Sequence, residues 1–180
     1  MVSGKLDPEA EEYLRQTEQP DAPPLESVSP GEMREACVEL VKQFGGAPEP
    51  VANVRNLQID GPAGPIPIRI YTPEGSGPFP VVVYFHGGGW VLGDPSTHEN
   101  IAQPLARSAG CVTVSVDYRL APEHIFPAAV EDAYAATQWV AENSDSINGN
   151  ADRIAVGGDS AGGNLAAAVC LKARNEGGRS

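Results

Sequence analysis

The turn around one serine constrains the fold of this chain more than any other feature of its sequence. The pentapeptide Gly158-Asp159-Ser160-Ala161-Gly162 follows a short apolar run, Arg153 to Val156, and precedes an alanine-rich segment that begins at Asn164. A tight strand-to-helix turn holds its central residue in a strained conformation and has room for almost no side chain beside it. The pattern predicts a nucleophile elbow with Ser160 at its tip, supported by Gly158, Asp159 and Gly162. A plain glycine-rich turn is the alternative.

A second motif follows another predicted strand. The apolar run Val81 to Phe85 is typical of a buried parallel strand, and His86-Gly87-Gly88-Gly89-Trp90 comes directly after it. Successive glycines leave backbone N–H groups unobstructed. Such groups stabilise the negative charge that develops on a carbonyl oxygen when a serine attacks it. We expect Gly87 or Gly88, together with Ala161, to supply this oxyanion hole.

The other residues of the glycine motif are expected to support it. His86 stands at the end of a strand, where its side chain can anchor the glycine loop by hydrogen bonds, and we favour this role over that of a general base. Gly89 completes the motif. Trp90 either forms the floor of an acyl pocket or packs in the core, and the sequence leaves both open.

Three segments together carry a family resemblance. His86 to Trp90, Asp117 to His124 and Gly158 to Ala166 resemble, in this order, motifs of the hormone-sensitive-lipase-like family of α/β-hydrolases. The members of this family are serine carboxylesterases and lipases. The resemblance covers about residues 50 to 175. It implies an α/β-hydrolase fold, with a looser resemblance between the acidic N-terminal arm and the cap segment of such enzymes.

The resemblance also assigns roles to particular residues. It implies that Ser160 is the nucleophile and that Gly87, Gly88 and Ala161 form the oxyanion hole. The Tyr-Arg-Leu-Ala-Pro-Glu stretch would then be a structural loop. We expect Asp117 and Glu123 to brace this loop around Arg119 by charged hydrogen bonds. Asp159 is too close to the nucleophile in sequence to act as the triad acid.

The order of the remaining catalytic residues departs from the family pattern. In α/β-hydrolases the acid and then the histidine follow the serine. Here His86, His98 and His124 all precede Ser160, and Glu176 is the one acid beyond it. We therefore expect neither triad partner in this chain. The chain is predicted to be the N-terminal portion of a longer enzyme, cut after the elbow helix and inactive by itself. Use of an upstream histidine as the base is the alternative.

Composition narrows the class of protein further. Hydrophobic residues make up 41% of the chain, which is enough for a core in one domain, and no apolar run approaches the ~18 residues of a membrane span. The N-terminus lacks the basic start and apolar stretch of a secretory signal, so a cytoplasmic location is expected. The cysteines Cys37, Cys111 and Cys170 lack metal-ligand spacing. We expect no cofactor, metal site or disulfide.

Charge is concentrated at the N-terminus. The chain has a formal charge of −12, and residues 1–39 hold ten acidic and three basic residues, a net charge of −7. Such a surface repels phosphate backbones and anionic lipids, so nucleic acid and membrane are poor partners. Apolar residues recur at near-helical spacing between Leu6 and Phe44, which predicts two helices separated by the proline-rich turn Pro20 to Pro24. These helices would suit a cap over an active-site mouth.

The rest of the chain alternates between strand and helix patterns, which is typical of a sheet covered by helices on both faces. The predicted strands are 54–59, 66–71, 80–85, 112–116 and 153–156, and the predicted helices are 98–109, 127–143 and 161–175. Gly61 to Pro65 is the expected loop of a hairpin. The prediction divides the chain into an arm, residues 1–50, and an incomplete α/β-hydrolase domain, residues 51–180. A strand left at the edge of the cut sheet would favour oligomers or aggregates.

Three functional hypotheses follow. The leading one is hydrolysis of small-molecule carboxylic esters with short or medium acyl chains, through an acyl-enzyme on Ser160. The second is a ligand-binding protein that keeps the pocket of the fold but has no catalysis. The third is an amidase or acyltransferase, which forms the same acyl-enzyme but uses a different leaving group or acceptor.

Overall fold

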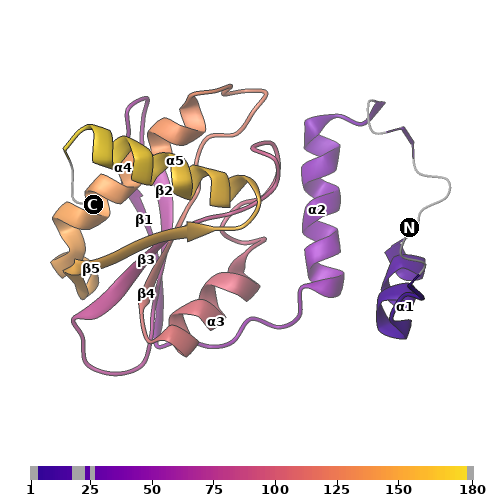
Figure 1. Cartoon of the computed structure of the whole chain (residues 1–180), viewed down its shortest axis with the longest axis horizontal. Helices are drawn as coiled ribbons and strands as arrows, with labels where there is room; N and C mark the ends of the chain where they lie inside the picture. The colour runs from indigo at the N-terminus through magenta and orange to yellow at the C-terminus, as the bar shows by residue number, and fades with distance from the viewer. Residues whose placement is uncertain (1–3, 18–22, 25–26, 178–180) are drawn as a thin grey trace.

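The apolar runs of the sequence form the strands of one sheet, with helices on both of its faces (Figure 1). The structure is a computed structural model that describes residues 4–17, 23–24 and 27–177. In chain order its elements are α1 (Pro8–Thr17), α2 (Pro30–Phe44), β1 (Asn53–Ile59), β2 (Ile66–Thr72), β3 (Phe79–Phe85), α3 (Glu99–Ala109), β4 (Val112–Val116), α4 (Ala128–Asn143), the short 3-10 helix η2 (Ser144–Ile147), β5 (Gly149–Gly158) and α5 (Ala161–Asn175). Every strand and helix predicted from the sequence is present.

The described residues form a five-stranded sheet in the order β1-β2-β4-β3-β5. β3 pairs in parallel with β4 and with β5, whereas β1 and β2 are antiparallel to their neighbours. Ile59 lies opposite Ile66, so the predicted hairpin is confirmed. Phe85 and Gly158 lie side by side at the carboxyl ends of β3 and β5. This register brings the glycine loop and the elbow to the same edge of the sheet.

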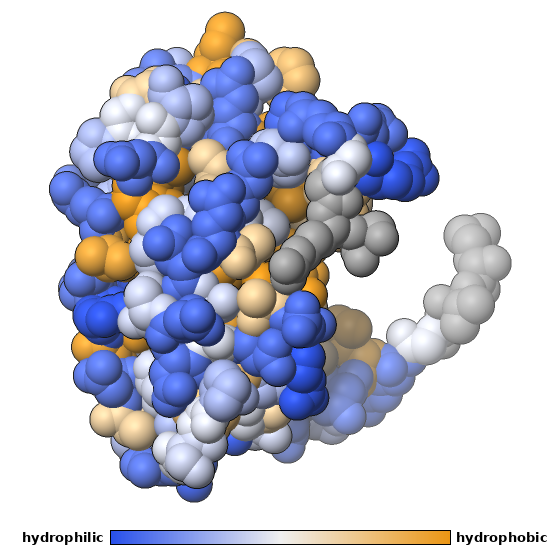
Figure 2. Space-filling model, turned by 90° about the vertical axis from the view of Figure 1, so that its left-hand side faces the viewer, coloured by the Kyte–Doolittle hydropathy of each residue, from blue (hydrophilic) through white to orange (hydrophobic). Residues whose placement is uncertain are grey.

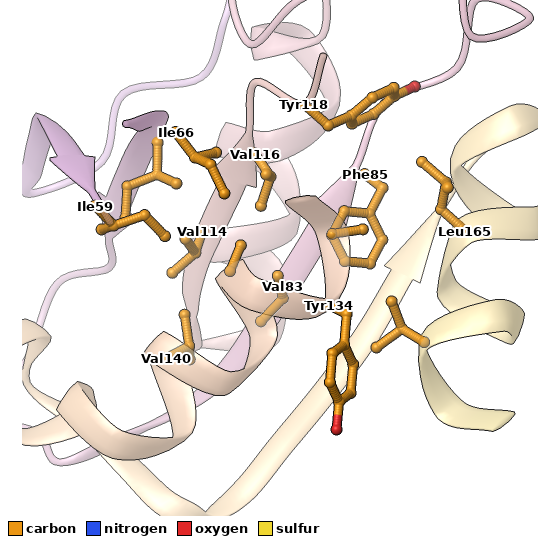
Figure 3. Packing of buried hydrophobic residues seen from close by; sticks show 14 of the residues in the cluster. Ile59, Ile66, Val83, Phe85, Val114, Val116, Tyr118, Tyr134, Val140 and Leu165 are labelled. Atoms are coloured by element: carbon orange, nitrogen blue, oxygen red, sulfur yellow. The ribbon is translucent and has the colours of Figure 1, made fainter. Parts of the chain in front are cut away.

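The core lies between the sheet and its helices. All five residues of β4 are buried, as expected for a strand covered on both faces. α3 contacts β2 and β4, while α4 and α5 pack on each other and against β3 and β5. Figure 3 shows Phe85 of β3 near Leu165 of α5 and Tyr118, all of them part of one buried cluster. Burial of each such side chain contributes roughly 1.5–3 kcal/mol, which fixes α5 and the elbow before it on the sheet.

The N-terminal arm contains both predicted helices. α2 begins with a capping box, in which the Glu32 N–H donates to the Ser29 side chain and the Ser29 N–H donates to the Glu32 carboxylate at 2.8 Å. The Tyr13 ring meets the Phe44 ring edge to face, with centroids 5.5 Å apart. The predicted turn Pro20 to Pro24 lies largely outside the described residues, which include only Pro23 and Pro24 of it.

One face of the molecule is mostly polar. Figure 2 shows this face, on which hydrophilic residues predominate and hydrophobic residues come to the surface in patches between them. None of the described helices is long and apolar enough to cross a membrane. The three cysteines carry free thiols, and of these Cys111 is buried and Cys170 is exposed.

β5 is an edge strand of the described sheet. It pairs with β3 along one side, and a groove of about 790 Å³ lies between it and α5, lined by Ile154, Val156 and Val169 among others. Ala155, in the middle of the strand, is exposed. An exposed edge strand with apolar residues beside it tends to pair with other chains unless a charged residue or a bulky group blocks the edge.

We therefore expect the 180-residue chain to self-associate through β5. Replacement of Ala155 by lysine places a charge on this edge and should shift the protein toward monomer in size-exclusion chromatography with light scattering. Ser108→Lys adds the same charge on the exposed side of α3 and should leave the association unchanged. A parent chain that is monomeric at every concentration would contradict this expectation.

Candidate active site

The elbow holds Ser160 in a strained backbone conformation. Ser160 has φ +50° and ψ −116°, lies between β5 and α5, and is exposed. A serine with positive φ is uncommon, and such strain persists only where the surrounding structure enforces it. A Cβ atom at Gly158 or at Gly162 would overlap the Phe85 carbonyl oxygen. The end of β3 therefore packs directly against the elbow backbone, and only glycine fits at these two positions.

Among the described residues, the glycine loop and the elbow present free N–H groups, and these include two of the three predicted donors, Gly88 and Ala161. The Gly87 N–H donates to Asp159 Oδ1 at 2.9 Å. Of the two alternatives, Gly87 or Gly88, Gly87 thus already has an acceptor in the described structure. Within the described part of the chain, the N–H groups of Gly88, Gly89 and Ala161 donate no hydrogen bond. Gly89, expected only to complete the motif, thus joins the candidate donors.

The Asp159 carboxylate links the elbow to two other segments. Its Oδ1 accepts hydrogen bonds from the Gly87 N–H and, at 2.6 Å, from the Tyr84 hydroxyl. His98 Nε2 lies 3.7 Å from the same oxygen. Burial and the bond to Asp159 both raise the pKa of Tyr84, so its hydroxyl stays protonated and keeps donating. Because Asp159 is held in this way, it sets the position of the glycine loop relative to Ser160.

His86 anchors the glycine loop from its buried side, as predicted. Its side chain is fully buried, its Nδ1 lies 2.8 Å from the Gly87 carbonyl oxygen, and its ring stacks on Tyr118 at a centroid distance of 4.3 Å. The Tyr118 hydroxyl donates to the His86 carbonyl at 2.6 Å. Burial lowers the pKa of His86 to about 4, so the ring is neutral near pH 7.

The structure brings no described residue into hydrogen-bond contact with the Ser160 side chain. His86 is buried below the loop, His98 faces Asp159, and His124 lies on an exposed loop. No group of metal-ligating side chains gathers among residues 4–17, 23–24 and 27–177. The site thus holds a candidate nucleophile and candidate oxyanion donors, and no described histidine forms a hydrogen bond with Ser160.

The charged residues of the loop after β4 pair differently from the prediction. The Arg119 side chain donates twice to Asp132 of α4, at 2.8 Å each, and the Arg119 N–H donates to the same carboxylate. Glu123 is bound by Arg34 of α2, which lowers the pKa of Glu123 to about 2. The predicted charged hydrogen bonds of this loop are thus present for Glu123, with Arg34 as the partner, whereas Arg119 itself binds Asp132 and not Asp117 or Glu123. Asp132 could have been found as the one acid on the buried alanine face of α4.

An apolar cavity of about 320 Å³ opens beside the glycine loop. Its walls include Gly89 and Trp90 of the loop, Phe126 before α4, and Asn164, one helical turn after Ser160. Trp90 is 40% exposed, so it lines this cavity and does not pack in the core. Phe126 is 84% exposed. A cavity of this size with apolar walls can take an apolar group of a small molecule.

A strand-to-helix serine turn beside a glycine loop, on a mixed sheet with helices on both faces, is the architecture of an α/β-hydrolase. A family model described as the alpha/beta hydrolase fold matches residues 82–180. The chain belongs to this family, and the resemblance found in its motifs is confirmed.

Proteins similar to this chain include named esterases. Esterase LipI of Mycobacterium tuberculosis is 54% identical over 132 residues, which are 72% of this chain and 41% of that protein. An arylesterase of Saccharolobus solfataricus is 38% identical over 94% of this chain and 55% of its own length. Among solved structures, the Pyrobaculum calidifontis esterase has a TM-score of 0.84 and 45% identity, and covers 97% of this chain and 55% of its own. An ester hydrolase from the metagenome of Lake Arreo has a TM-score of 0.92 and 38% identity, and the match covers 98% of this chain and 57% of the hydrolase. The chain spans about half the length of these relatives.

The buried neutral His86 should make stability depend on pH. Its pKa is about 4 in the folded protein against 6.5 when unfolded, so the contribution to stability is fully present above pH 6.5 and is lost as the pH falls toward 4. The loss amounts to about 3 kcal/mol. His86→Asn keeps a donor for the Gly87 carbonyl but cannot titrate, so urea unfolding should show a weaker pH dependence between pH 7 and 4.

The control for this measurement is His124→Gln on the exposed loop, which should keep the pH dependence of the parent. Equal pH dependence in the parent and in His86→Asn would contradict a buried neutral His86.

Proposed function

We propose that this chain supplies the nucleophile and the oxyanion hole of a carboxylic ester hydrolase that acts on small-molecule esters. One observation carries the proposal. An exposed serine in a strained elbow stands beside the N–H groups of Gly88, Gly89 and Ala161, which have no partner within the described residues. The names of the similar proteins, an esterase, an arylesterase and an ester hydrolase, agree with it.

In the proposed reaction Ser160 Oγ attacks the ester carbonyl carbon and gives its proton to a base, while the carbonyl oxygen becomes negative. The free N–H groups of the glycine loop and of Ala161 then bind this oxyanion, and each donor of this kind contributes about 3–4 kcal/mol. Ala161 is the first residue of α5, so the positive end of the helix dipole also favours the negative charge. Collapse expels the alcohol and leaves an acyl-enzyme on Ser160, which water hydrolyses.

The base is proposed to lie in a part of the full-length protein outside this chain. None of the three histidines of the chain forms a hydrogen bond with Ser160 in the described structure, and the relatives are about twice as long as the chain. In this proposal residues 1–50 form a cap and residues 51–180 form part of the hydrolase domain. The cavity of about 320 Å³ suits the short or medium acyl chain of the substrate.

Fluorophosphonate labelling of the full-length protein tests the nucleophile. A base-activated serine reacts with this reagent, so the label should lie on Ser160, and Ser160→Ala should abolish both labelling and turnover of p-nitrophenyl butyrate. The control is Ser108→Ala on the exposed side of α3. Labelling at another residue, with turnover intact in Ser160→Ala, would contradict the proposal. The 180-residue chain alone should hydrolyse the same ester about 10⁶-fold more slowly.

Replacement of Gly88 by valine tests the oxyanion hole. Gly88 has φ +117°, and a Cβ atom there would overlap the Leu92 backbone, so the loop has to move. Displacement of its N–H groups should lower kcat about 10²–10³-fold in the full-length protein. Gly75→Val is a matched control, because Gly75 has φ +113° in a loop between β2 and β3. Equal kcat in the two folded variants would mean that the glycine loop serves packing alone.

A further inference from the structure

One guanidinium joins the N-terminal arm to the two loops beside the cavity. Arg34 Nε donates to the Val91 carbonyl at 2.8 Å, and its NH2 group donates to the Ala121 carbonyl at 3.0 Å. The same side chain forms a two-point ion pair with Glu123, at 2.8 and 2.7 Å. These four bonds span 57 to 89 residues of sequence.

The two carbonyls that Arg34 binds belong to the cavity walls or their direct neighbours. Val91 follows Trp90, and its N–H donates to the Gly88 carbonyl at 3.0 Å. The Ala121 N–H donates to the Trp90 carbonyl at 2.8 Å, and Ala121 and Trp90 both line the cavity. The guanidinium therefore closes a network that contains the glycine loop on one side and the loop after β4 on the other.

The geometry of this network requires arginine. The Arg34 side chain is 31% exposed and Glu123 is 52% exposed, and an ion pair with so much solvent contact contributes little alone. The bonds to the two carbonyls fix the orientation of the Arg34 side chain, because a guanidinium group presents several donors in one rigid plane. A lysine has a single ammonium group and cannot reach both carbonyls and the carboxylate in this arrangement.

We propose that Arg34 is a positioning residue that makes α2 part of the substrate site. By binding the carbonyls of Val91 and Ala121, it holds Trp90 against the cavity and fixes the loop that carries the Gly88 and Gly89 N–H groups. Its effect on catalysis rests on the proposed function, whereas its effect on Trp90 does not. The group positioned in the cavity is the apolar acyl or alcohol part of an ester.

Trp90 fluorescence in the 180-residue chain tests this proposal without any need for activity. The chain has two tryptophans, Trp90 and Trp139, so a Trp139→Phe background leaves Trp90 as the single reporter. In this background Arg34→Met should raise the acrylamide quenching constant of Trp90 about twofold and shift its emission to the red. Arg34→Lys should fall between Arg34→Met and the parent, because it keeps the charge toward Glu123.

Asn100→Ala is the matched control for general loosening of the arm. Asn100 of α3 donates to the Gly45 carbonyl at 2.8 Å, just after the end of α2, and neither residue lines the cavity. This variant should leave the Trp90 signal unchanged. An unchanged signal in Arg34→Met, or an equal change in Asn100→Ala, would overturn the positioning role. Circular dichroism of each variant identifies those that fold like the parent.

Kinetics of the full-length protein test the catalytic consequence. Arg34→Met should lower kcat/KM for p-nitrophenyl butyrate about tenfold, with kcat and KM both affected, since both the loop and the cavity wall move. Lys42→Met removes an exposed charge of the same helix and should change neither value. If the unsubstituted full-length protein is inactive but Trp90 responds to Arg34→Met as expected, the proposed function is contradicted and the positioning role is not. Full activity in Arg34→Met would overturn the catalytic part of this inference.

Discussion

The site depends on one close contact, in which the backbone at the end of β3 packs against the backbone of the elbow. The Phe85 carbonyl occupies the space that a Cβ atom at Gly158 or Gly162 would need. This contact is possible because β3 and β5 are parallel neighbours and end at the same level. It places the glycine loop, which continues from β3, beside the serine, which continues from β5. Pairing of two strands thus converts two distant sequence motifs into one site.

Hydrogen bonds then fix the glycine loop in position beside the elbow. Asp159 holds the Gly87 N–H and the Tyr84 hydroxyl, while His86 and Tyr118 support the loop from the buried side. The N–H groups of Gly88 and Gly89 donate no hydrogen bond within the described residues. An unpaired donor is costly in a buried position, but at an exposed site it is available to a substrate. We infer that the Asp159 bond selects which N–H groups of the glycine loop remain free.

The sequence predicted the elements well and the long-range polar contacts poorly. Strands such as 112–116 and the elbow itself are encoded by local patterns of apolar residues and glycine, so they could be predicted without knowledge of the fold. The choice among the N–H groups of three successive glycines depends on a carboxylate 72 residues away, which no local pattern contains. Likewise, Arg119 does not pair with Asp117 or Glu123, the acids near it in sequence. It pairs with Asp132, which the packing of α4 brings to it.

Amide chemical shifts of the full-length protein test the central claim most directly, that Gly88, Gly89 and Ala161 are the oxyanion donors while Gly87 is held by Asp159. A phosphonate bound to Ser160 places a negative oxygen where the ester oxygen would develop its charge. On formation of this adduct, the proton resonances of the Gly88, Gly89 and Ala161 amides should move downfield as they donate to that oxygen. The Gly87 amide should stay in place. A downfield shift of Gly87 with the other three unchanged would contradict the account.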